Sequence, residues 1–270
     1  RDRLRSRGLG DVYKRQIPDI SKIKSVRLLD LKERHYGLLF VRERKTSNVE
    51  RIICIIIGYV FGMFQTAFFY GKMHGIDIRE HGSGNAGTTN TLRVLGTKAG
   101  LIVFAGDVLK CMIAVWITTL IFKGSHADEI YLLKLYTAAG AILGHNYPFY
   151  LKFKGGKGIA ATAGLILAFH PYFIPVGFVL FFGVFLTTHY VSLGSLLIYV
   201  GLMTEMVICG QTGLFGAAQP VLNEMYAVTA FLTILAFYKH KENISRLLHG
   251  NERKTYLFKK NKVEAENKNK

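Results

Sequence analysis

The stretch RIICIIIGYVFGMFQTAFFYG, residues 51–71, decides the fold, because its only charge stands at its first position and most of the residues that follow are apolar. About 20 predominantly apolar residues suffice to cross the hydrocarbon core of a bilayer as a helix. A helix satisfies its own backbone hydrogen bonds, which lipid cannot do for it. A soluble domain of this size would alternate polar and apolar residues instead. We therefore expect this segment to span a membrane.

Similar apolar runs recur along the chain, which has 270 residues, of which 50% are hydrophobic and 20% charged. The charges gather at the N-terminal end, in a few loops and in the tail, and the apolar runs lie between them. This segregation predicts an all-α integral membrane protein with about seven transmembrane helices joined by glycine-rich loops. Besides 51–71, the expected spans are 99–122, 131–147, 158–170, 172–188, 191–209 and 224–239.

Basic residues indicate how the spans are oriented. Four Lys and Arg lie in 72–98, three in 148–157 and ten in the tail from Lys239, whereas the alternate loops hold one, Lys123. Since positively charged loops stay inside the cell, we expect the first set and the C-terminus to be cytoplasmic and the N-terminus of the first span to be outside. The net charge of +17 follows from these loops. No module of interleaved basic and aromatic residues suggests a nucleic-acid partner.

The N-terminal 50 residues differ from the rest, with 14 Lys and Arg, 7 Asp and Glu and no clear periodicity. They lack the apolar segment of a secretory signal, and their charge contradicts an outside N-terminus. We expect residues 1–48 to be a disordered extension of non-native or upstream origin. Residues 49–258 should form one transmembrane domain, and residues 259–270 a basic cytoplasmic tail.

The first cytoplasmic motif is GSGNAGTTNTLRVLG, residues 82–96. Its glycines free the backbone to turn N–H groups toward a ligand, and a following helix would attract anions at its N-terminus. Arg93 would add a bidentate cation. An ordinary turn between spans is the alternative. The spacing is not that of a dinucleotide site, because no strand precedes it.

The second motif is GHNYPFYLKFKGGKGIAAT, residues 144–162, in which three lysines surround three glycines. The combination of flexible backbone donors, ammonium groups and a helix start suits phosphate. It is not a Walker A loop, since Gly158 follows Lys157. Positive-inside charge alone would explain the lysines but not the glycines beside them.

The third motif is HKENISRLLHGNERK, residues 240–254, directly after the last expected span. A basic helix lying on anionic lipid would account for Arg246 but not for Asn243 or Glu252. Asp107 and Lys110 lie three residues apart within the second span. Charges there are either paired or functional, and both readings stay open.

The three cysteines are far apart within apolar runs, so we interpret them as small buried side chains. No CxxC pair or His/Cys cluster indicates a metal, and we expect neither metal nor cofactor.

Taken in order, the three motifs resemble those of the PlsY family of bacterial glycerol-3-phosphate acyltransferases. The family patterns read GSGNxGATNxxR, GHxFPxFLxFKGGKGVAT and HxxNIxRLLxGxExK, and the stretches GDVLKC and HYVSLGS also resemble family stretches. The resemblance covers residues 51–258. Its departures are small: Thr88 replaces the usual Ala, Tyr147 the usual Phe, and Ile159-Ala160-Ala161 a Val-Ala pair.

This resemblance implies transfer of an acyl group from acyl phosphate to glycerol 3-phosphate, giving lysophosphatidic acid and phosphate. It implies no acyl-carrier protein, coenzyme A or metal, with lipid as the surroundings; we further expect a monomer. The other common acyltransferase design uses a His-x4-Asp pair, and no histidine here has Asp five positions on. A transporter of an anionic phosphorylated metabolite and a non-catalytic scaffold remain as alternatives.

Two sets of site residues follow. We expect Ser83, Asn243 and His240 to act on the substrates at the reaction centre, and Glu252 to orient either the acceptor hydroxyl or the third motif itself. The residues expected to bind substrate are Gly84, Asn85, Thr88, Asn90, Arg93, Lys110, His145, Lys154, Gly155, Gly156, Lys157, Gly158 and Arg246.

Overall fold

The computed structural model describes residues 46–257, and within that range every regular element is a helix. The tail expected at 259–270 and all but the last three residues of the expected extension lie outside it. The helices are α3 (Asn48–Met63), α4 (Thr66–Met73), α5 (Thr88–Leu95), α6 (Thr97–Phe122), α7 (Ile130–Asn146), α8 (Ile159–Phe169), α9 (Phe173–Phe178), the π-helix η4 (Val179–Gly183), α10 (Val184–Thr188), α11 (Val191–Gln211), α12 (Gln219–Lys239) and α13 (Lys241–Leu248), with short 3-10 turns η1 (Ile78–Glu80), η2 (Ala127–Glu129) and η3 (Phe149–Leu151).

The expected all-helical membrane architecture is confirmed, and each of the expected spans coincides with helix. Four helical stretches within residues 46–257 are long and apolar enough to cross a membrane. Shorter apolar helices occupy Ile159–Phe169 and Phe173–Thr188, and α7 fills the remaining expected span. The count of seven stays a prediction. The four long stretches are Asn48–Met73, Thr97–Phe122, Val191–Gln211 and Gln219–Lys239.

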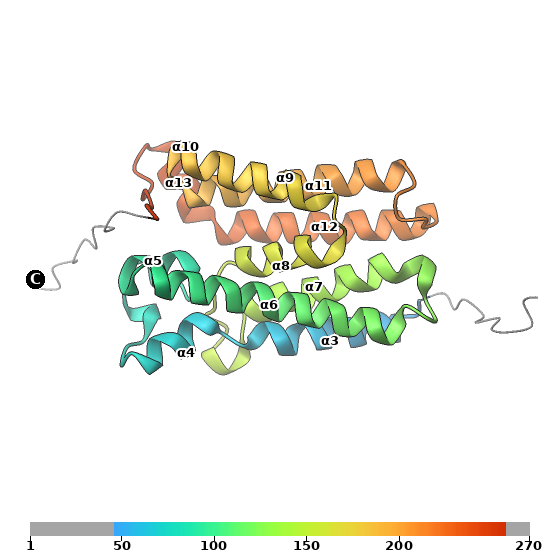
Figure 1. Cartoon of the computed structure of the whole chain (residues 1–270), viewed down its shortest axis with the longest axis horizontal. Helices are drawn as coiled ribbons and strands as arrows, with labels where there is room; N and C mark the ends of the chain where they lie inside the picture. The colour runs from blue at the N-terminus through green and yellow to red at the C-terminus, as the bar shows by residue number, and fades with distance from the viewer. Residues whose placement is uncertain (1–45, 258–270) are drawn as a thin grey trace, which may run out of the picture. The chain divides into compact units, whose positions relative to one another are not determined.

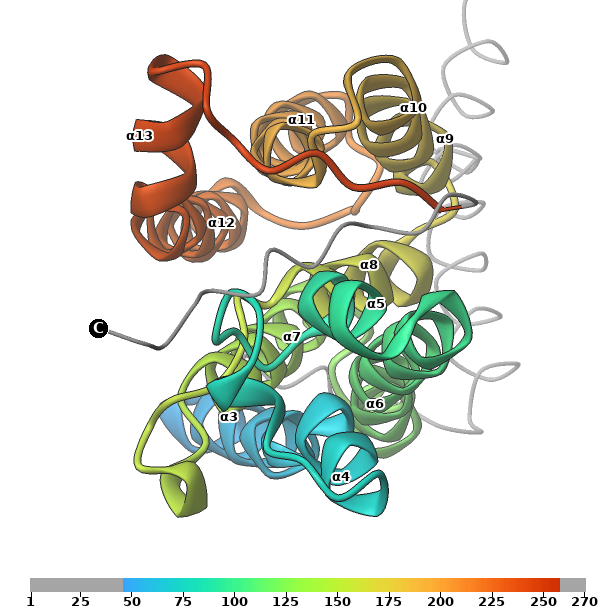
Figure 2. The same ribbon diagram turned by 90° about the vertical axis from the view of Figure 1, so that its left-hand side faces the viewer.

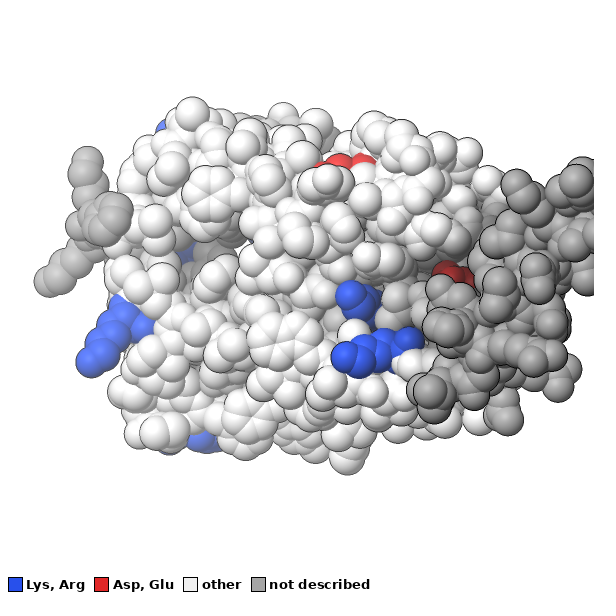
Figure 3. Space-filling model, turned by 45° about the vertical axis from the view of Figure 1, so that its right-hand side comes forward, with Lys and Arg blue, Asp and Glu red and all other residues white. Residues whose placement is uncertain are grey.

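The outward faces of the long helices are apolar, as a lipid environment requires. Large hydrophobic side chains such as Val60, Leu120 and Ile234 are more than half exposed. Figure 3 shows a face on which uncharged residues predominate and Lys, Arg, Asp and Glu are few. In water such a surface would be an aggregation hazard, whereas in a bilayer it faces hydrocarbon.

Helices α3 and α7 pack backbone to backbone through paired small residues. A side chain on Gly58 would collide with the carbonyl oxygen of Thr137, and one on Gly140 with that of Ile55. Gly62 and Gly144, one turn further along each helix, are in the same situation. Two small-xxx-small pairs therefore face one another, which is the arrangement that brings membrane helices closest together.

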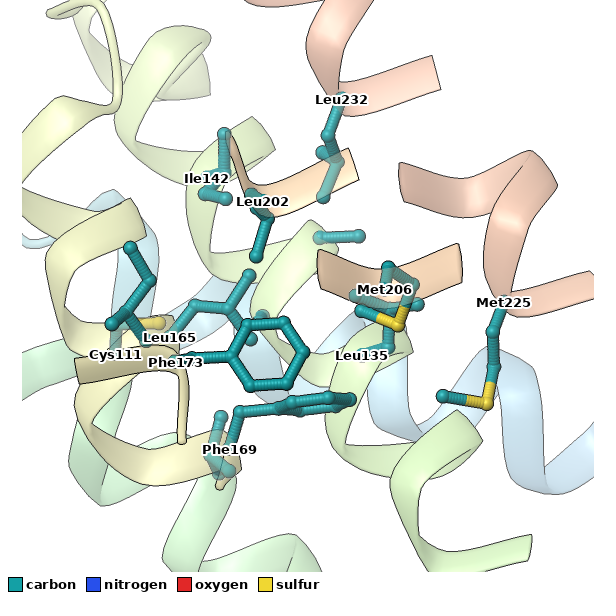
Figure 4. Packing of buried hydrophobic residues seen from close by; sticks show 14 of the residues in the cluster. Cys111, Leu135, Ile142, Leu165, Phe169, Phe173, Leu202, Met206, Met225 and Leu232 are labelled. Carbon is teal, nitrogen blue, oxygen red and sulfur yellow. The ribbon is translucent and has the colours of Figure 1, made fainter. Parts of the chain in front are cut away.

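A second layer is built from α9 to α13, with α8 between it and the α3–α7 group (Figures 1 and 2). The main apolar core fills this junction. Phe169 and Phe173 pack edge to face, 5.3 Å between ring centroids, beside Met206 of α11 (Figure 4). The short helix α8 is thus packed on both sides.

The two ends of the bundle differ. At one end, Ser47 caps α3, and the backbone N–H of Thr46 donates to the Glu129 carboxylate at 2.8 Å. The packed unit therefore includes residues 46–48 as well as those from Val49. At the other end lie α5, α13 and the segment 251–257, which crosses the end of the helices in Figure 2. All three sequence motifs lie at this second end.

Candidate active site

A single cavity of about 910 Å³ is lined by all three motifs. It lies among the loop 79–90, the start of α5, the N-termini of α8 and α11, and the last turn of α12 with α13. The convergence expected from the sequence is therefore present in the structure. The expected residues that line the cavity are Ser83, Gly84, Asn85, Thr88, Asn90, Arg93, His145, Lys157, Gly158, His240, Asn243, Arg246 and Glu252.

Asn90 shapes the first motif from within. Its side-chain oxygen accepts the backbone N–H of Ser83 at 2.8 Å, and its amide nitrogen donates to the carbonyls of Ile78 and His81, both at 3.0 Å. Asn90 is buried, so both amide protons and the oxygen are used inside the loop. Gly84 adopts the left-handed conformation at φ 70°, which glycine permits without strain. The Ser83 hydroxyl is left exposed at the cavity, with no hydrogen bond to the described residues.

The second motif folds back over the end of α7. The backbone N–H of Gly156 donates to the carbonyl of His145 at 3.0 Å, and a side chain on Gly156 would overlap the imidazole of His145. Gly158 then turns the chain at φ 83° and begins α8. Gly158, Ile159 and Ala160 at this helix start line the cavity, and the first N–H groups of a helix stabilise an anion. The glycines that the positive-inside rule left unexplained thus allow close packing.

Asp107, Lys110 and His145 form a buried cluster behind this loop. The ammonium of Lys110 lies 2.8 Å from Asp107 Oδ1, 2.9 Å from His145 Nδ1 and 2.7 Å from the carbonyl oxygen of Phe64. Thr66 also donates to Asp107 Oδ1 at 3.0 Å. Asp107 and Lys110 are therefore paired, which was one of the two alternatives for these charges, and the contact of Lys110 with His145 extends the cluster from α6 to α7.

Glu252 ties the third motif together. One carboxylate oxygen accepts from Asn243 Nδ2 at 2.7 Å and from the Ser192 hydroxyl at 3.0 Å. The other accepts from Arg246 Nε at 2.8 Å. Because both oxygens are occupied, Glu252 is placed to orient α13 against α11. Asn243 in turn accepts a hydrogen bond from the Lys157 ammonium, so the second and third motifs are joined.

The segment after α13 closes the cavity over Arg93. The guanidinium donates to Thr255 Oγ1 at 2.6 Å and to the carbonyl oxygen of Arg253 at 3.2 Å. The backbone N–H of Thr255 donates to the carbonyl of His189 at 2.9 Å. These contacts connect the first motif to the end of the chain's third motif, and they leave no carboxylate directly bonded to Arg93 among residues 46–257.

Burial and like charges perturb two titratable groups in the cavity. Loss of water around Lys157, with repulsion from Arg246, lowers the pKa of the ammonium to about 8. Burial, with the nearby Lys157 charge, lowers the pKa of His240 to about 4, so this imidazole is neutral near pH 7. Its Nδ1 lies 2.8 Å from the carbonyl oxygen of Ala236 and must donate to it, which leaves Nε2 as an acceptor. An anionic ligand would relieve the excess positive charge.

Four of the expected substrate-binding residues do not line the cavity: Lys110, Lys154, Gly155 and Gly156. Conversely, the sequence reasoning assigned no site role to Ser192, Ser195 and Phe181, which do line it. The two serines belong to HYVSLGS, which resembles a stretch of the family sequences but has no function assigned from the sequence. Phe181 lies in η4 and had no signal of its own, because an aromatic residue in an apolar run reads as lipid-facing or core.

The donor set does not suit a metal. Within residues 46–257, no three His, Cys, Asp or Glu side chains come together as ligands, and Cys54, Cys111 and Cys209 are separate free thiols. The cavity instead offers seven Lys and Arg against four Asp and Glu, with Phe104, Phe181 and Val191 on an apolar wall. This arrangement suits an anionic molecule that carries a hydrocarbon part.

Comparison with known proteins gives concordant results. Residues 52–250 match the family model described as glycerol-3-phosphate acyltransferase. Relatives of that name from Thermosipho melanesiensis and Exiguobacterium sibiricum are 39% and 37% identical, and the matches cover 79% and 81% of this chain and 99% and 100% of the relatives.

Two solved structures are also similar. The crystal structure of PlsY, an integral membrane glycerol 3-phosphate acyltransferase, in its glycerol 3-phosphate form shares 31% identity at a TM-score of 0.67, with 77% of this chain and 99% of that chain covered. The lysophosphatidic acid form of PlsY shares 30% identity at a TM-score of 0.63, with 77% and 96% covered.

Proposed function

Because this chain belongs to the glycerol-3-phosphate acyltransferase family, we propose that its cavity takes the acyl group from an acyl phosphate and passes it to glycerol 3-phosphate. The family inferred from the three motifs is confirmed, and the protein is an acyltransferase embedded in a membrane. The acyl phosphate donor, the role of each residue and the orientation are the proposal.

The observation that carries the proposal is the supply of cations from three separate motifs to one cavity. Arg93 comes from α5, Lys157 from the loop before α8, and Arg246 from α13. Both proposed substrates carry phosphate, so two anionic groups must be neutralised in one place. Arg93 has no carboxylate bonded to it in the described chain, and the depressed pKa of Lys157 reflects an uncompensated cation. Both are suited to charge-assisted contacts with phosphate oxygens.

The acceptor hydroxyl is best served by Ser83 and His240. The Ser83 hydroxyl has no partner among residues 46–257, and His240 presents an unprotonated Nε2. A neutral imidazole can accept the hydrogen bond of an alcohol and thereby direct its lone pair at the donor carbonyl. Asn243 and Glu252 act indirectly, by positioning other residues. Asn243 is hydrogen-bonded to Lys157, and Glu252 is hydrogen-bonded to Asn243 and Arg246.

The proposed reaction requires little acid–base catalysis by the protein. The hydroxyl oxygen at position 1 of glycerol 3-phosphate attacks the carbonyl carbon of the acyl phosphate, and a new C–O ester bond forms. The bond between that carbon and the phosphate oxygen breaks, and the hydroxyl proton ends on the departing phosphate. Alignment, oxyanion stabilisation and neutralisation of the leaving group then account for the rate. The apolar wall of Phe104, Phe181 and Val191 supports a place for the start of the acyl chain.

The membrane is proposed to be the bacterial plasma membrane, with the cavity and the C-terminus on the cytoplasmic side. The distribution of Lys and Arg supports this orientation, because the cavity end of the bundle carries the basic loops. No carrier protein, coenzyme A or metal takes part in the proposed reaction, and all three motifs belong to the same chain. A monomer should therefore be active.

The test is release of inorganic phosphate from a long-chain acyl phosphate by purified protein in nanodiscs. Release should require glycerol 3-phosphate and should equal the lysophosphatidic acid formed. The matched control replaces acyl phosphate by the acyl-coenzyme A of the same chain. Lysophosphatidic acid formed from acyl-coenzyme A alone would overturn the proposed donor, and phosphate release without glycerol 3-phosphate would indicate hydrolysis instead of transfer.

A further inference from the structure

The ammonium group of Lys110 has three protons and three acceptors in contact with it. They are Phe64 O at 2.7 Å, Asp107 Oδ1 at 2.8 Å and His145 Nδ1 at 2.9 Å. The lysine is buried, so water does not compete for these protons. Lysine donates and cannot accept, which means that each of the three partner atoms must accept.

This requirement fixes the state of His145. Because Nδ1 accepts from Lys110, it carries no proton, and a neutral imidazole must then hold its proton on Nε2. The alternative, an Nδ1–H donating to Asp107, would need a bond over 3.7 Å and would place two donors against each other at 2.9 Å. That separation exceeds the normal range of a hydrogen bond.

The proton on Nε2 has no acceptor within residues 46–257. His145 is 3% exposed, it lines the cavity, and no hydrogen bond to Nε2 exists in the described chain. A side chain on Gly156 would collide with Nε2, so glycine at this position lets the loop before α8 pack directly against the imidazole. The N-terminus of α8 begins two residues further along, at Gly158.

We propose that Lys110 and Asp107 are positioning residues that hold His145 as a hydrogen-bond donor, and that its Nε2–H binds a phosphate oxygen of the substrate beside the N-terminus of α8. His145 then shares an anion site with the backbone N–H groups of that helix. This inference rests on the proposed function for the identity of the phosphate, but the tautomer follows from the contacts of Lys110 alone.

The two cavity histidines therefore have opposite roles. His240 donates through Nδ1 to Ala236 and offers an accepting Nε2, whereas His145 accepts through Nδ1 and offers a donating Nε2. His145 can stabilise a developing negative charge but cannot take a proton from the acceptor hydroxyl. Lys110, expected from the sequence to bind substrate, acts through His145 from behind the cavity wall.

A cluster that merely joins α6 to α7 would share these contacts, so the test needs a readout of the imidazole proton. Protein with ¹⁵N-labelled histidine is placed in nanodiscs, and the His145 signals are identified by difference from His145→Asn. The ¹⁵N spectrum should show the proton on Nε2 and a bare, hydrogen-bonded Nδ1. Addition of inorganic phosphate, glycerol 3-phosphate or a non-hydrolysable acyl phosphonate should shift the Nε2 signal for the ligand that it contacts, which identifies the phosphate.

Activity supplies a second arm. The amide nitrogen of His145→Gln reaches the position of Nε2, and that of His145→Asn the position of Nδ1. Gln should keep kcat/KM within about fivefold, and Asn should lose at least about tenfold, as expected for one charge-assisted hydrogen bond. Lys110→Arg keeps the charge and should preserve the Nε2–H tautomer.

A proton found on Nδ1, or an Nε2 signal that responds to none of the three ligands, overturns the inference even if activity is normal. Should the wild-type protein fail to use acyl phosphate while Nε2 responds to glycerol 3-phosphate, the proposed donor is wrong and the assignment of His145 stands. If one of the two variants folds poorly, the difference spectrum is taken with the other, and the wild-type tautomer is still decided.

Discussion

Replacing Glu252 by Gln removes one negative charge from a buried junction and changes nothing in its size. The carboxylate is 4% exposed and accepts three hydrogen bonds, from Asn243, Ser192 and Arg246. The amide can keep its oxygen toward Asn243 and Ser192. Its nitrogen must then face Arg246 Nε, so that two donors meet where an ion pair stood.

The magnitude follows from these contacts. A hydrogen bond between charged groups contributes roughly 1.5–3 kcal/mol, and an unpaired buried donor costs about 1–3 kcal/mol. Arg246 is 32% exposed, so water can satisfy its Nε–H and screens the lost pair. We therefore expect the free energy of unfolding to fall by about 2 kcal/mol, which is less than the sum of the two contributions because of this screening. This reduces the equilibrium for docking of α13 by roughly thirtyfold.

Two assays measure this effect in parallel. Thermal unfolding can be followed with a thiol-reactive dye, because Cys54 and Cys111 are buried and react only on unfolding. Phosphate release gives kcat and KM. The variant should unfold at a lower temperature and show a raised KM for glycerol 3-phosphate, since Lys157 and Arg246 both depend on Glu252 for their position.

The matched control is Glu242→Gln, which makes the same chemical change on α13, the helix that Glu252 contacts from the following segment. Glu242 is 78% exposed and lies 3.9 Å from Arg246, so its removal should alter neither stability nor KM. If Glu252→Gln unfolds at the wild-type temperature, the role of Glu252 in holding α13 is refuted. If it is stable but inactive with an unchanged KM, Glu252 acts at the reaction centre instead.

Arg93→Ala should lower kcat/KM by an amount equivalent to roughly 2–4 kcal/mol, because a charge-assisted phosphate contact is lost. Lys98→Ala, at an exposed position in the first turn of α6, should be neutral, and equal values of kcat/KM for both variants would remove Arg93 from the site. With the pKa of Lys157 lowered to about 8 in the free protein, this ammonium is charged below that pH and neutral above it, so kcat/KM for glycerol 3-phosphate should fall as the pH rises through about 8. Lys157→Arg should move this fall to higher pH, and a profile identical to wild type would contradict the assignment. Gly140→Ala should destabilise the protein by roughly 1–3 kcal/mol, since its side chain would overlap the carbonyl oxygen of Ile55. Gly183→Ala, where a side chain meets nothing, is the thermal-unfolding control, and an equal melting temperature for the two would refute the close contact of α3 and α7.

Several features could be predicted because they depend on the hydrophobicity and charge of consecutive residues. The apolar runs indicated the helices, and the positions of the lysines and arginines indicated which ends of those helices belong together. The glycines of the first two motifs indicated a backbone that is free to turn, and Gly84 and Gly158 have positive φ angles. Each of these follows from the composition of a short segment and needs no knowledge of its neighbours in space.

The roles of individual residues within the cavity depend on their neighbours in space. Asn90 was expected to bind substrate, but both ends of its amide are used to shape the loop around Ser83. Glu252 was placed at the reaction centre or in the support of its motif, and its three hydrogen bonds favour support. A polar residue in a motif can serve either the ligand or the loop, and the sequence does not distinguish the two.

The sequence by itself determined an all-helical membrane protein with its three polar motifs at one end, since hydrophobicity and net charge add up residue by residue. Only the tertiary structure decided which polar groups form hydrogen bonds with one another. Lys110 and His145 are 35 positions apart and Ser192 and Glu252 are 60 apart, yet each pair is hydrogen-bonded. Hydrogen bonds form over about 3 Å and depend on direction, so their partners are selected by how the helices pack. The tautomer of His145, and with it the ability to donate, is therefore a property of the fold.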